Sequence, residues 1–160
     1  MQTPLLLLDV DGVLSLFGFD PAAAPPGRFV SVDGIPHLLS TEAAGHVLAL
    51  IGAYELVWCT GWEDRADEHL PFALGLPAGA PHLRFGDAAA PGRHWKLDAI
   101  DAFAGEDRPV AWIDDGFDGS CHVWAAARPG PTKLIQTEPS IGLTATQAEE
   151  LRCWAAALRR

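Results

Sequence analysis

The chain contains 160 residues, of which 49% are apolar and 20% are charged, and its formal net charge is −10 at pH 7. This length and composition predict a single globular domain over residues 1–160, with a hydrophobic core. The acidic balance argues against an extended surface for polyanions, although a local basic patch or a bound metal ion can offset it. The three cysteines lack disulfide or zinc-type spacing, and no apolar run is long enough to cross a membrane, so we expect a cytoplasmic protein without a membrane partner.

The N-terminal half alternates apolar strands with helical segments. A continuous apolar run predicts a buried strand from Leu5 to Asp9. The Asp33-Gly34 pair predicts a hairpin within residues 28–39, the main part of a small flap over about 15–40. Further along, the sequence predicts a helix capped by Thr41 that ends near residue 53, a buried strand over 55–60 and a helix over about 63–72.

The C-terminal half continues this alternation. It predicts a short strand over 82–85, a helix over about 93–103, a buried strand over 109–114, a helix over 117–127 and a last strand over 132–136. Thr144 and Gln147 have the spacing of a capping box for a final helix over about 147–158.

Alternating strands and helices are typical of an α/β fold. We expect a three-layer, Rossmann-like parallel sheet with helices on both faces and the strand Leu5–Asp9 at its centre. Such sheets bind ligands at the carboxyl ends of their strands. The acidic and hydroxyl residues at those ends are therefore the candidates for chemistry.

Two of the predicted strands end in paired carboxylates. Asp9 and Asp11 follow the first strand, and Asp114 and Asp115 end a later one, with Asp118 just beyond. Clustered carboxylates repel one another, which favours a divalent cation between them or a proton on one of them. Magnesium prefers oxygen ligands of this kind. Each motif alone also fits a solvated turn.

Two further residues could complete a phosphate site. Thr60, followed by Gly61, ends the second strand and can offer a hydroxyl and backbone N–H groups to a phosphate oxygen. Lys96 is expected on a helix ahead of the Asp114 strand, from which it could supply a fixed positive charge. Taken singly, they fit a strand-to-helix cap and a surface lysine.

Their order along the chain, Asp-x-Asp-Gly, Thr, Lys and then Asp-Asp, resembles the haloacid dehalogenase-like (HAD-like) phosphohydrolase superfamily over most of the sequence. The resemblance implies a phosphomonoesterase dependent on Mg²⁺. Asp9 would be the nucleophile that forms an aspartyl-phosphate, and Asp11 the general acid and base. Thr60 and Lys96 would hold the phosphoryl oxygens.

The resemblance also implies the metal ligands. These would be Asp9, the backbone carbonyl of Asp11, and Asp115, with Asp114 as a further acid of the metal site or its orienting neighbour. The sequence leaves open which of Asp114, Asp115 and Asp118 touches the ion, and Asp115 is our first choice.

Asp11 indicates the reaction class, and the lengths of the intervals between the motifs indicate the size of the substrate. Dehalogenases of the superfamily generally lack an acid at the position of Asp11, so phosphate chemistry is favoured. The intervals 14–55 and 73–92 have no room for a folded cap domain, so the chain resembles the capless members, whose sites are open. The expected partner is a phosphorylated substrate, either a small molecule or a nucleic-acid end; any protein partner is unknown.

A second, shorter resemblance is to the phosphatase domains of polynucleotide kinase-phosphatases and related RNA-repair enzymes. It makes a nucleic-acid 3′-phosphatase an alternative function, with Trp62 and Trp95 beside the site as surfaces on which a base can stack. The acidic net charge counts against this, and Arg65, Arg84 and Arg93 are the residues expected to compensate locally.

Three other interpretations concern parts of the same sequence. The alternative that is not an enzyme is a catalytically silent binding module, which would use the acidic site for a metal or a partner. Cys59 and Arg65 have the spacing of a cysteine-phosphatase loop, but the bulky, acidic residues between them argue against a phosphate cradle. Solvated or capping roles are expected for His69 and His94.

Overall fold

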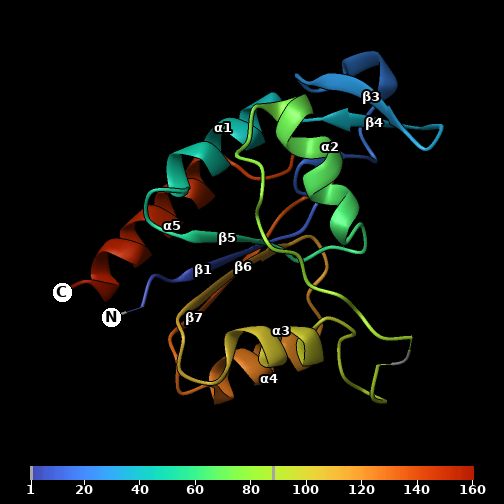
Figure 1. Cartoon of the computed structure of the whole chain (residues 1–160). Coiled ribbons are helices and arrows are strands. Elements are labelled where there is room, and N and C mark those ends of the chain that lie inside the picture. Colours follow the sequence, from blue (N-terminus) through green and yellow to red (C-terminus); the bar gives the residue numbers. More distant parts are fainter. Residues whose placement is uncertain (1, 88) are drawn as a thin grey trace.

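The main sheet of the protein contains four parallel strands in the order β5–β1–β6–β7 (Figure 1). A computed structural model describes residues 2–87 and 89–160 of the chain. The strands are β1 (Leu5–Leu8), β5 (Glu55–Trp58), β6 (Val110–Asp114) and β7 (Thr132–Gln136). Strand β1 therefore lies inside the sheet, between β5 and the pair β6–β7, which confirms the arrangement predicted from the sequence.

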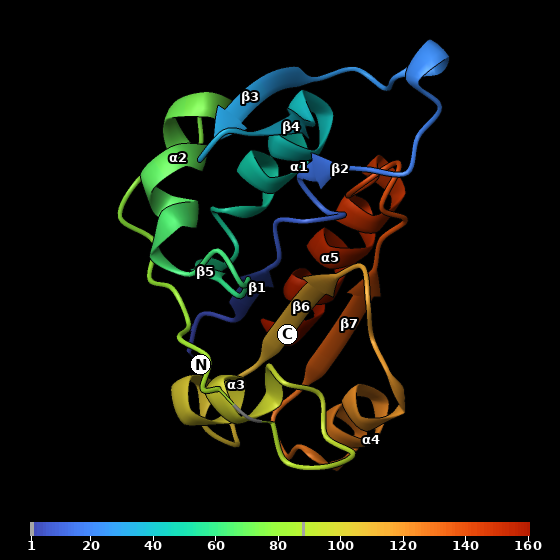
Figure 2. The ribbon, with the colours of Figure 1, turned by 90° about the vertical axis from the view of Figure 1, so that its right-hand side faces the viewer.

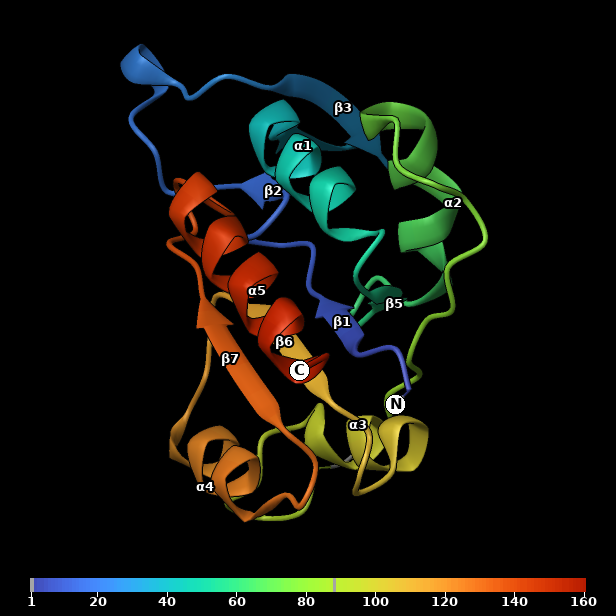
Figure 3. The same ribbon diagram turned by 90° about the vertical axis from the view of Figure 1, so that its left-hand side faces the viewer.

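Helices cover both faces of this sheet. They are α1 (Thr41–Leu50), α2 (Asp64–Leu74), α3 (Leu97–Ala104), α4 (Gly119–Ala127) and α5 (Ala145–Leu158). Helices α1, α2 and α5 lie on one face, and α3 and α4 lie on the other (Figures 2 and 3).

The four leucines of β1 show why the sheet has two cores. Successive residues of a strand point to opposite faces. Leu6 and Leu8 accordingly pack with the apolar side chains of α1, α2 and α5, whereas Leu5 and Leu7 pack with those of α3 and α4. All four are fully buried. These two cores confirm the expected three-layer α/β architecture.

A small antiparallel sheet forms the predicted flap. Its strands are β2 (Ser15–Leu16), β3 (Arg28–Val32) and β4 (Ile35–Leu39), in the order β2–β4–β3, with a short 3₁₀ helix, Pro21–Ala23, between β2 and β3. The turn residues Asp33 and Gly34 have φ angles of 52° and 78°, as a tight two-residue hairpin requires. We call residues 15–39 the flap; no large cap domain is inserted in the described part of the chain.

Two arginines attach the flap to α2. Arg65 on α2 forms an ion pair with Asp33 at the tip of the hairpin, with Nη2 2.7 Å from Oδ2. At the other end of α2, Nη1 of Arg28 donates a hydrogen bond of 3.0 Å to the carbonyl of Ala73. The flap therefore lies beside α2, as Figure 1 shows.

The strand expected over 82–85 is reduced to a single bridge. His82 pairs with Trp58 at the free edge of β5, where Leu83 donates one backbone hydrogen bond of 2.9 Å to Trp58. Pro81 has no N–H to extend the ladder. The main sheet thus has four strands in the described residues instead of five.

Several helix boundaries also differ from expectation. Ser40, rather than Thr41, caps α1, because its hydroxyl accepts a 3.0 Å hydrogen bond from the N–H of Ala43. Helix α3 begins at Leu97, later than expected, after a segment of turns. The capping box at Thr144 and Gln147 is present, with α5 beginning at Ala145. Among the described helices, none has the length and apolar character that a membrane crossing requires.

Candidate active site

Residues that follow β1, β5 and β6 meet at one pocket of about 330 Å³, at the carboxyl ends of these strands. Its lining consists of Asp9, Asp11, Gly61, His94, Trp95, Lys96, Asp114, Asp115 and Gly116. The structure therefore brings together the paired carboxylates and the lysine that the sequence singled out. Thr60 is fully buried beside this lining.

Asp9 is buried at the base of the pocket, with 6% of its surface exposed. Its Oδ1 atom accepts a 2.8 Å hydrogen bond from the N–H of Val10 and lies 3.2 Å from Nζ of Lys96. Burial raises the pKa of Asp9 to about 7, and nearby Asp114 adds to the rise, while Lys96 acts against it. One oxygen of Asp9 is thus held in place by two donors, and its charge is costly in the metal-free protein.

Lys96 is the cation of the site and is only 2% exposed. Its Nζ atom donates to Oδ2 of Asp114 at 2.6 Å and to the carbonyl of Cys59 at 2.9 Å, in addition to the contact with Asp9. Its charge is therefore shared between carboxylates from β6 and from the end of β1. The sequence placed Lys96 within a helix; it occupies instead the N-cap position of α3, at the end of the turns that precede the helix.

The two acids at the end of β6 have different surroundings. Both oxygens of Asp114 accept hydrogen bonds, one from Lys96 and the other from the N–H of Gly116 at 3.0 Å. Asp115 is half-buried and faces the pocket. Burial, followed by repulsion from Asp114, raises the pKa of Asp115. Asp114 is therefore tied to the lysine, while Asp115 is the acid more open to a ligand.

The three acids Asp9, Asp114 and Asp115 are spaced for a metal ion. One ligand oxygen from each lies within 4.8 Å of the others. Bringing these carboxylates together is unfavourable, as the raised pKa values of Asp9 and Asp115 indicate, and a divalent cation would remove that cost. All-oxygen donors suit Mg²⁺. The donor set thus fits the ion that the sequence implied.

Gly12 allows Asp115 to approach the loop after β1. Its φ angle is +76°, and a Cβ atom built on it would lie 2.6 Å from Cγ of Asp115. Its carbonyl accepts a 2.8 Å hydrogen bond from the hydroxyl of Thr137, at the end of β7. Glycine is therefore required here both by backbone conformation and by space.

Asp11 lies at the exposed side of the pocket. Its Oδ2 atom accepts a 3.0 Å hydrogen bond from the indole N–H of Trp62. The ring of Trp62 in turn meets the ring of His37 on the flap, with centroids 4.8 Å apart. Asp11 is thus connected to the flap as well as to the pocket.

The loop that carries Thr60 has an unusual backbone. The hydroxyl of Thr60 accepts a 3.2 Å hydrogen bond from the N–H of Trp62. Glu63, which follows, has φ 50° and ψ −124°, a sparsely populated conformation for a residue other than glycine. Such strain occurs where surrounding contacts hold a loop in one shape. Here it accompanies the placement of Trp62 against Asp11.

Asp118, the third acid considered as a metal ligand, has a different role. It is the N-cap of α4, and its Oδ1 atom accepts hydrogen bonds from the N–H groups of Ser120 and Cys121, at 2.9 and 3.3 Å. It is not a member of the three-acid cluster formed by the described residues. The cap explains its presence after Asp114-Asp115.

Sequence reasoning gave His94 only a solvated or capping role, and it missed two other residues near the site. His94 lines the pocket, and burial lowers its pKa. Thr137 and His37 had no identified role, yet they contact Gly12 and Trp62. Thr137 carried a usable signal, because it follows a predicted strand just as Thr60 does. The role of His37 depends on how the flap folds over α2.

The structure also places the cysteine and the three arginines that the sequence singled out. Burial raises the pKa of the Cys59 thiol, which argues further against a cysteine nucleophile. Of the three arginines expected to compensate the acidic charge, Arg65 pairs with Asp33 beside Trp62, and Arg84 is exposed. Arg93 lies at a different pocket.

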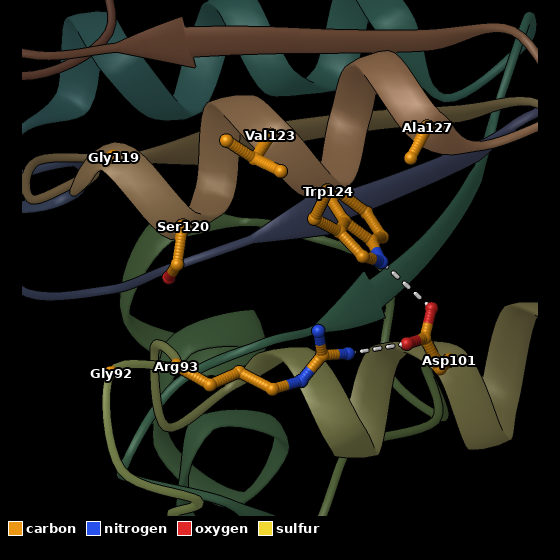
Figure 4. A pocket seen from close by; sticks show the side chains of 8 residues that line it. All are labelled: Gly92, Arg93, Asp101, Gly119, Ser120, Val123, Trp124 and Ala127. Atoms are coloured by element: carbon orange, nitrogen blue, oxygen red, sulfur yellow. Dashed lines mark hydrogen bonds and ion pairs between the residues drawn. The ribbon is translucent and has the colours of Figure 1, made fainter.

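That larger pocket, of about 540 Å³, lies between α3 and α4 and does not contain the acidic cluster. Figure 4 shows that its charged side chains are paired: Arg93 and the indole N–H of Trp124 both bind Asp101, at 2.6 and 2.7 Å. Arg93 also binds Asp98. This pocket therefore lacks the free charged groups that a phosphate ester would need.

Comparison with known proteins identifies a family. A family model described as "HAD domain in Swiss Army Knife RNA repair proteins" matches residues 5–148. The matched segment begins at the first residue of β1 and includes every residue that lines the 330 Å³ pocket. No curated protein sequence matches the chain.

Proposed function

This chain belongs to the family of HAD domains of Swiss Army Knife RNA repair proteins, and we propose that it is a magnesium-dependent phosphohydrolase that works through an aspartyl-phosphate on Asp9. The single observation that carries this proposal is the position of Asp9. Its carboxylate lies at the pocket, 3.2 Å from Nζ of Lys96 and in one cluster with Asp114 and Asp115. A nucleophile for phosphoryl transfer needs this combination of a fixed carboxylate and neighbouring positive charge.

In the first step, a carboxylate oxygen of Asp9 attacks phosphorus, and the bond from phosphorus to the leaving-group oxygen breaks. Oδ1 of Asp9 accepts a hydrogen bond from Val10 and forms an ion pair with Lys96, which fixes the orientation of the carboxylate and leaves Oδ2 as the attacking atom. Protonated Asp11 gives its proton to the leaving alcohol. The exposed position of Asp11 at the edge of the pocket supports this role, because the acid must meet an incoming group.

In the second step, water hydrolyses the aspartyl-phosphate. Asp11, now a carboxylate, takes a proton from water, the oxygen of that water attacks phosphorus, and the bond to Asp9 breaks. Inorganic phosphate leaves, and both Asp9 and the protonated Asp11 are restored. One residue thus serves as acid in the first step and as base in the second.

The other residues of the site stabilise the negative charge of the phosphoryl group or bind the metal ion in this proposal. Lys96 and the Thr60 loop face the transferred phosphoryl oxygens in this proposal, and they offset charge that develops during transfer. Asp9, Asp115 and the backbone carbonyl of Asp11 would hold Mg²⁺, with Asp114 orienting Lys96 beside them. When bound, the ion would neutralise phosphoryl charge and relieve the repulsion between the carboxylates.

The test is hydrolysis of an aryl phosphate by the purified chain, with and without Mg²⁺, in the wild type and in Asp9→Asn. We expect activity only in the wild type with metal. Activity that survives chelation of the metal, or that is retained by Asp9→Asn, would contradict the proposal.

The second candidate is a nucleic-acid end-processing phosphatase, for which 3′-phosphate is the expected position. The description of the matched family, with its reference to RNA repair, favours it. Trp95 lines the pocket and is half-exposed, so a terminal base can stack on it. Comparing 3′-phosphorylated and 5′-phosphorylated oligonucleotides with small phosphate esters of equal concentration tests this candidate directly.

A further inference from the structure

A further pocket, of about 290 Å³, lies between the flap and α2. It is lined by Asp11, Val32, Asp33, Ile35, His37, Trp62 and Arg65. Asp11 therefore lines both this pocket, which we call the flap pocket, and the pocket that contains Asp9. The two pockets meet at the residue proposed as general acid.

This shared residue determines where a substrate must lie. A general acid has to reach the leaving-group oxygen to within hydrogen-bond distance. In-line attack by Asp9 places that oxygen on the side of phosphorus opposite the nucleophile. With phosphorus above Asp9 and the leaving oxygen at Asp11, the rest of the leaving group extends past Asp11 into the flap pocket. This step rests on the proposed function.

The side chains of the flap pocket indicate the chemistry of that leaving group. Trp62 and His37 contribute two aromatic rings, and Val32 and Ile35 contribute aliphatic carbon. Ile35 is 60% exposed, so a ligand that covers it gains apolar contact. The single arginine, Arg65, is already paired with Asp33. These groups suit one planar, uncharged ring better than a second phosphate.

We propose that the flap pocket binds the nucleoside part of a phosphorylated nucleotide, with its base against Trp62 and Ile35. A single nucleoside, rather than a long strand, fits both the pocket volume and the net charge of −10. A surface of this charge does not provide the rows of Lys and Arg that an extended backbone needs.

Trp62 links occupancy of this pocket to catalysis. Its indole N–H donates to Oδ2 of Asp11, while its ring contacts His37, whose Nδ1 is 2.9 Å from the hydroxyl of Ser15. A ring placed on Trp62 therefore lies against the residue that orients Asp11. Trp62 is a positioning residue in this arrangement: it acts through Asp11 and lines the nucleoside site.

The experiment compares Ile35→Ser with Phe29→Ser. Both residues are exposed apolar side chains of the flap, at 60% and 71%, but only Ile35 lines the flap pocket. Kinetics are measured with nucleoside 3′- and 5′-monophosphates and with glycerol 2-phosphate, which has no ring. We expect Ile35→Ser to raise KM for the nucleotides by about fivefold to tenfold, with little change for glycerol 2-phosphate.

Phe29→Ser should leave KM unchanged for the nucleotides and for glycerol 2-phosphate. An Ile35→Ser enzyme whose KM is unaltered for nucleotides, or is raised equally for glycerol 2-phosphate, would overturn the nucleoside assignment while leaving the phosphohydrolase proposal intact.

Binding without turnover separates the two proposals. Adenosine and uridine are titrated into the wild type and into Ile35→Ser, and binding is followed by tryptophan fluorescence. We expect weaker binding by the variant. If no phosphate ester is hydrolysed but this difference is found, the proposed function fails and the nucleoside site stands. If neither nucleoside binds to the wild type at millimolar concentration, the nucleoside site fails whatever the outcome of the kinetic assays.

Discussion

Gly12 and Asp115 are packed so closely that a Cβ atom on Gly12 would lie 2.7 Å from Cβ of Asp115. The two residues follow different strands, β1 and β6, which are neighbours in the sheet. Their approach holds the loop that carries Asp11 against the carboxylate proposed to bind metal. The chain therefore depends on the absence of a side chain at Gly12 to assemble the site.

Replacing Gly12 by Ala should displace Asp115 as well as strain the backbone. Gly18→Ala is the matched control, because Gly18 has the same φ of +76° and a Cβ atom added to it would have nothing within 4 Å. Positive φ costs a non-glycine residue about 1–2 kcal/mol. We expect Gly18→Ala to lose that much stability in chemical denaturation, Gly12→Ala to lose at least as much, and Gly12→Ala alone to lose Mg²⁺ affinity. Equal Mg²⁺ affinity in the two variants would show that Asp115 tolerates displacement.

Asp115→Asn should weaken Mg²⁺ binding, because it removes the negative charge of a proposed ligand while keeping the side-chain volume. Calorimetry should show a loss of about tenfold or more. Asp118→Asn is the control, since Asp118 caps α4 and an asparagine can still cap a helix. Unchanged Mg²⁺ affinity in Asp115→Asn would identify Asp114, rather than Asp115, as the ligand at the end of β6.

Asp9 and Asp11 should differ in what they contribute. Asp9→Asn removes the nucleophile, so we expect no turnover and no covalent intermediate. Asp11→Asn should retain metal binding through its backbone carbonyl and lose proton transfer, an effect of about 10²–10⁴-fold.

The nature of the leaving group provides the readout. Aryl phosphates need little protonation of the leaving oxygen, so Asp11→Asn should lose least activity on them and more on alkyl phosphates. Rapid quenching with labelled substrate should label Asp9 in the wild type. A labelled residue other than Asp9 would refute the aspartyl-phosphate route.

Trp62→Phe keeps an aromatic ring at the flap pocket but removes the N–H that donates to Asp11. If this hydrogen bond orients Asp11, kcat should fall by about tenfold for alkyl phosphates and less for aryl phosphates, the same preference as in Asp11→Asn. Trp95→Phe is the comparison, since Trp95 lines the pocket that contains Asp9 and does not line the flap pocket. A uniform loss on both substrate types would mean that Trp62 acts only in packing.

The pH dependence of Mg²⁺ binding should follow Asp9. Burial, with a contribution from Asp114, raises the pKa of Asp9 to about 7 in the metal-free protein. Below that pH the carboxyl of Asp9 holds a proton that Mg²⁺ must displace. Above it the carboxyl is already ionised, so Mg²⁺ binding releases no proton. Apparent affinity should therefore fall about tenfold per pH unit below 7 and level off above it. Calorimetry in buffers of different ionisation enthalpy counts the released proton, and equal affinity at pH 5.5 and 8 would contradict this assignment.

Much of the architecture followed from local patterns in the sequence. The run Leu5–Leu8 identified a buried strand, Asp33-Gly34 identified the hairpin turn, and Thr144 with Gln147 identified the capping box. Each pattern acts between residues that are close along the chain, where backbone geometry alone relates side chains to one another. The position of acids and hydroxyls after apolar strands likewise indicated which residues meet, because parallel strands end at a common edge.

The distinctions within the site came only from the tertiary structure. Asp114 ends an apolar strand and Asp118 lies shortly after it, yet Asp114 binds Lys96 and Asp118 caps α4. The role of Asp114 depends on the turns that precede α3, because they bring Lys96 to the base of the pocket.

The flap shows the same limit of prediction from the sequence. The hairpin was predictable from its turn, but its contact with Trp62 through His37 was not, because it depends on how two segments distant in sequence pack together. Local preferences are determined by a few neighbouring residues. The contacts that orient Asp11, in contrast, exist only after β4, the loop following β5 and the loop following β1 have come together.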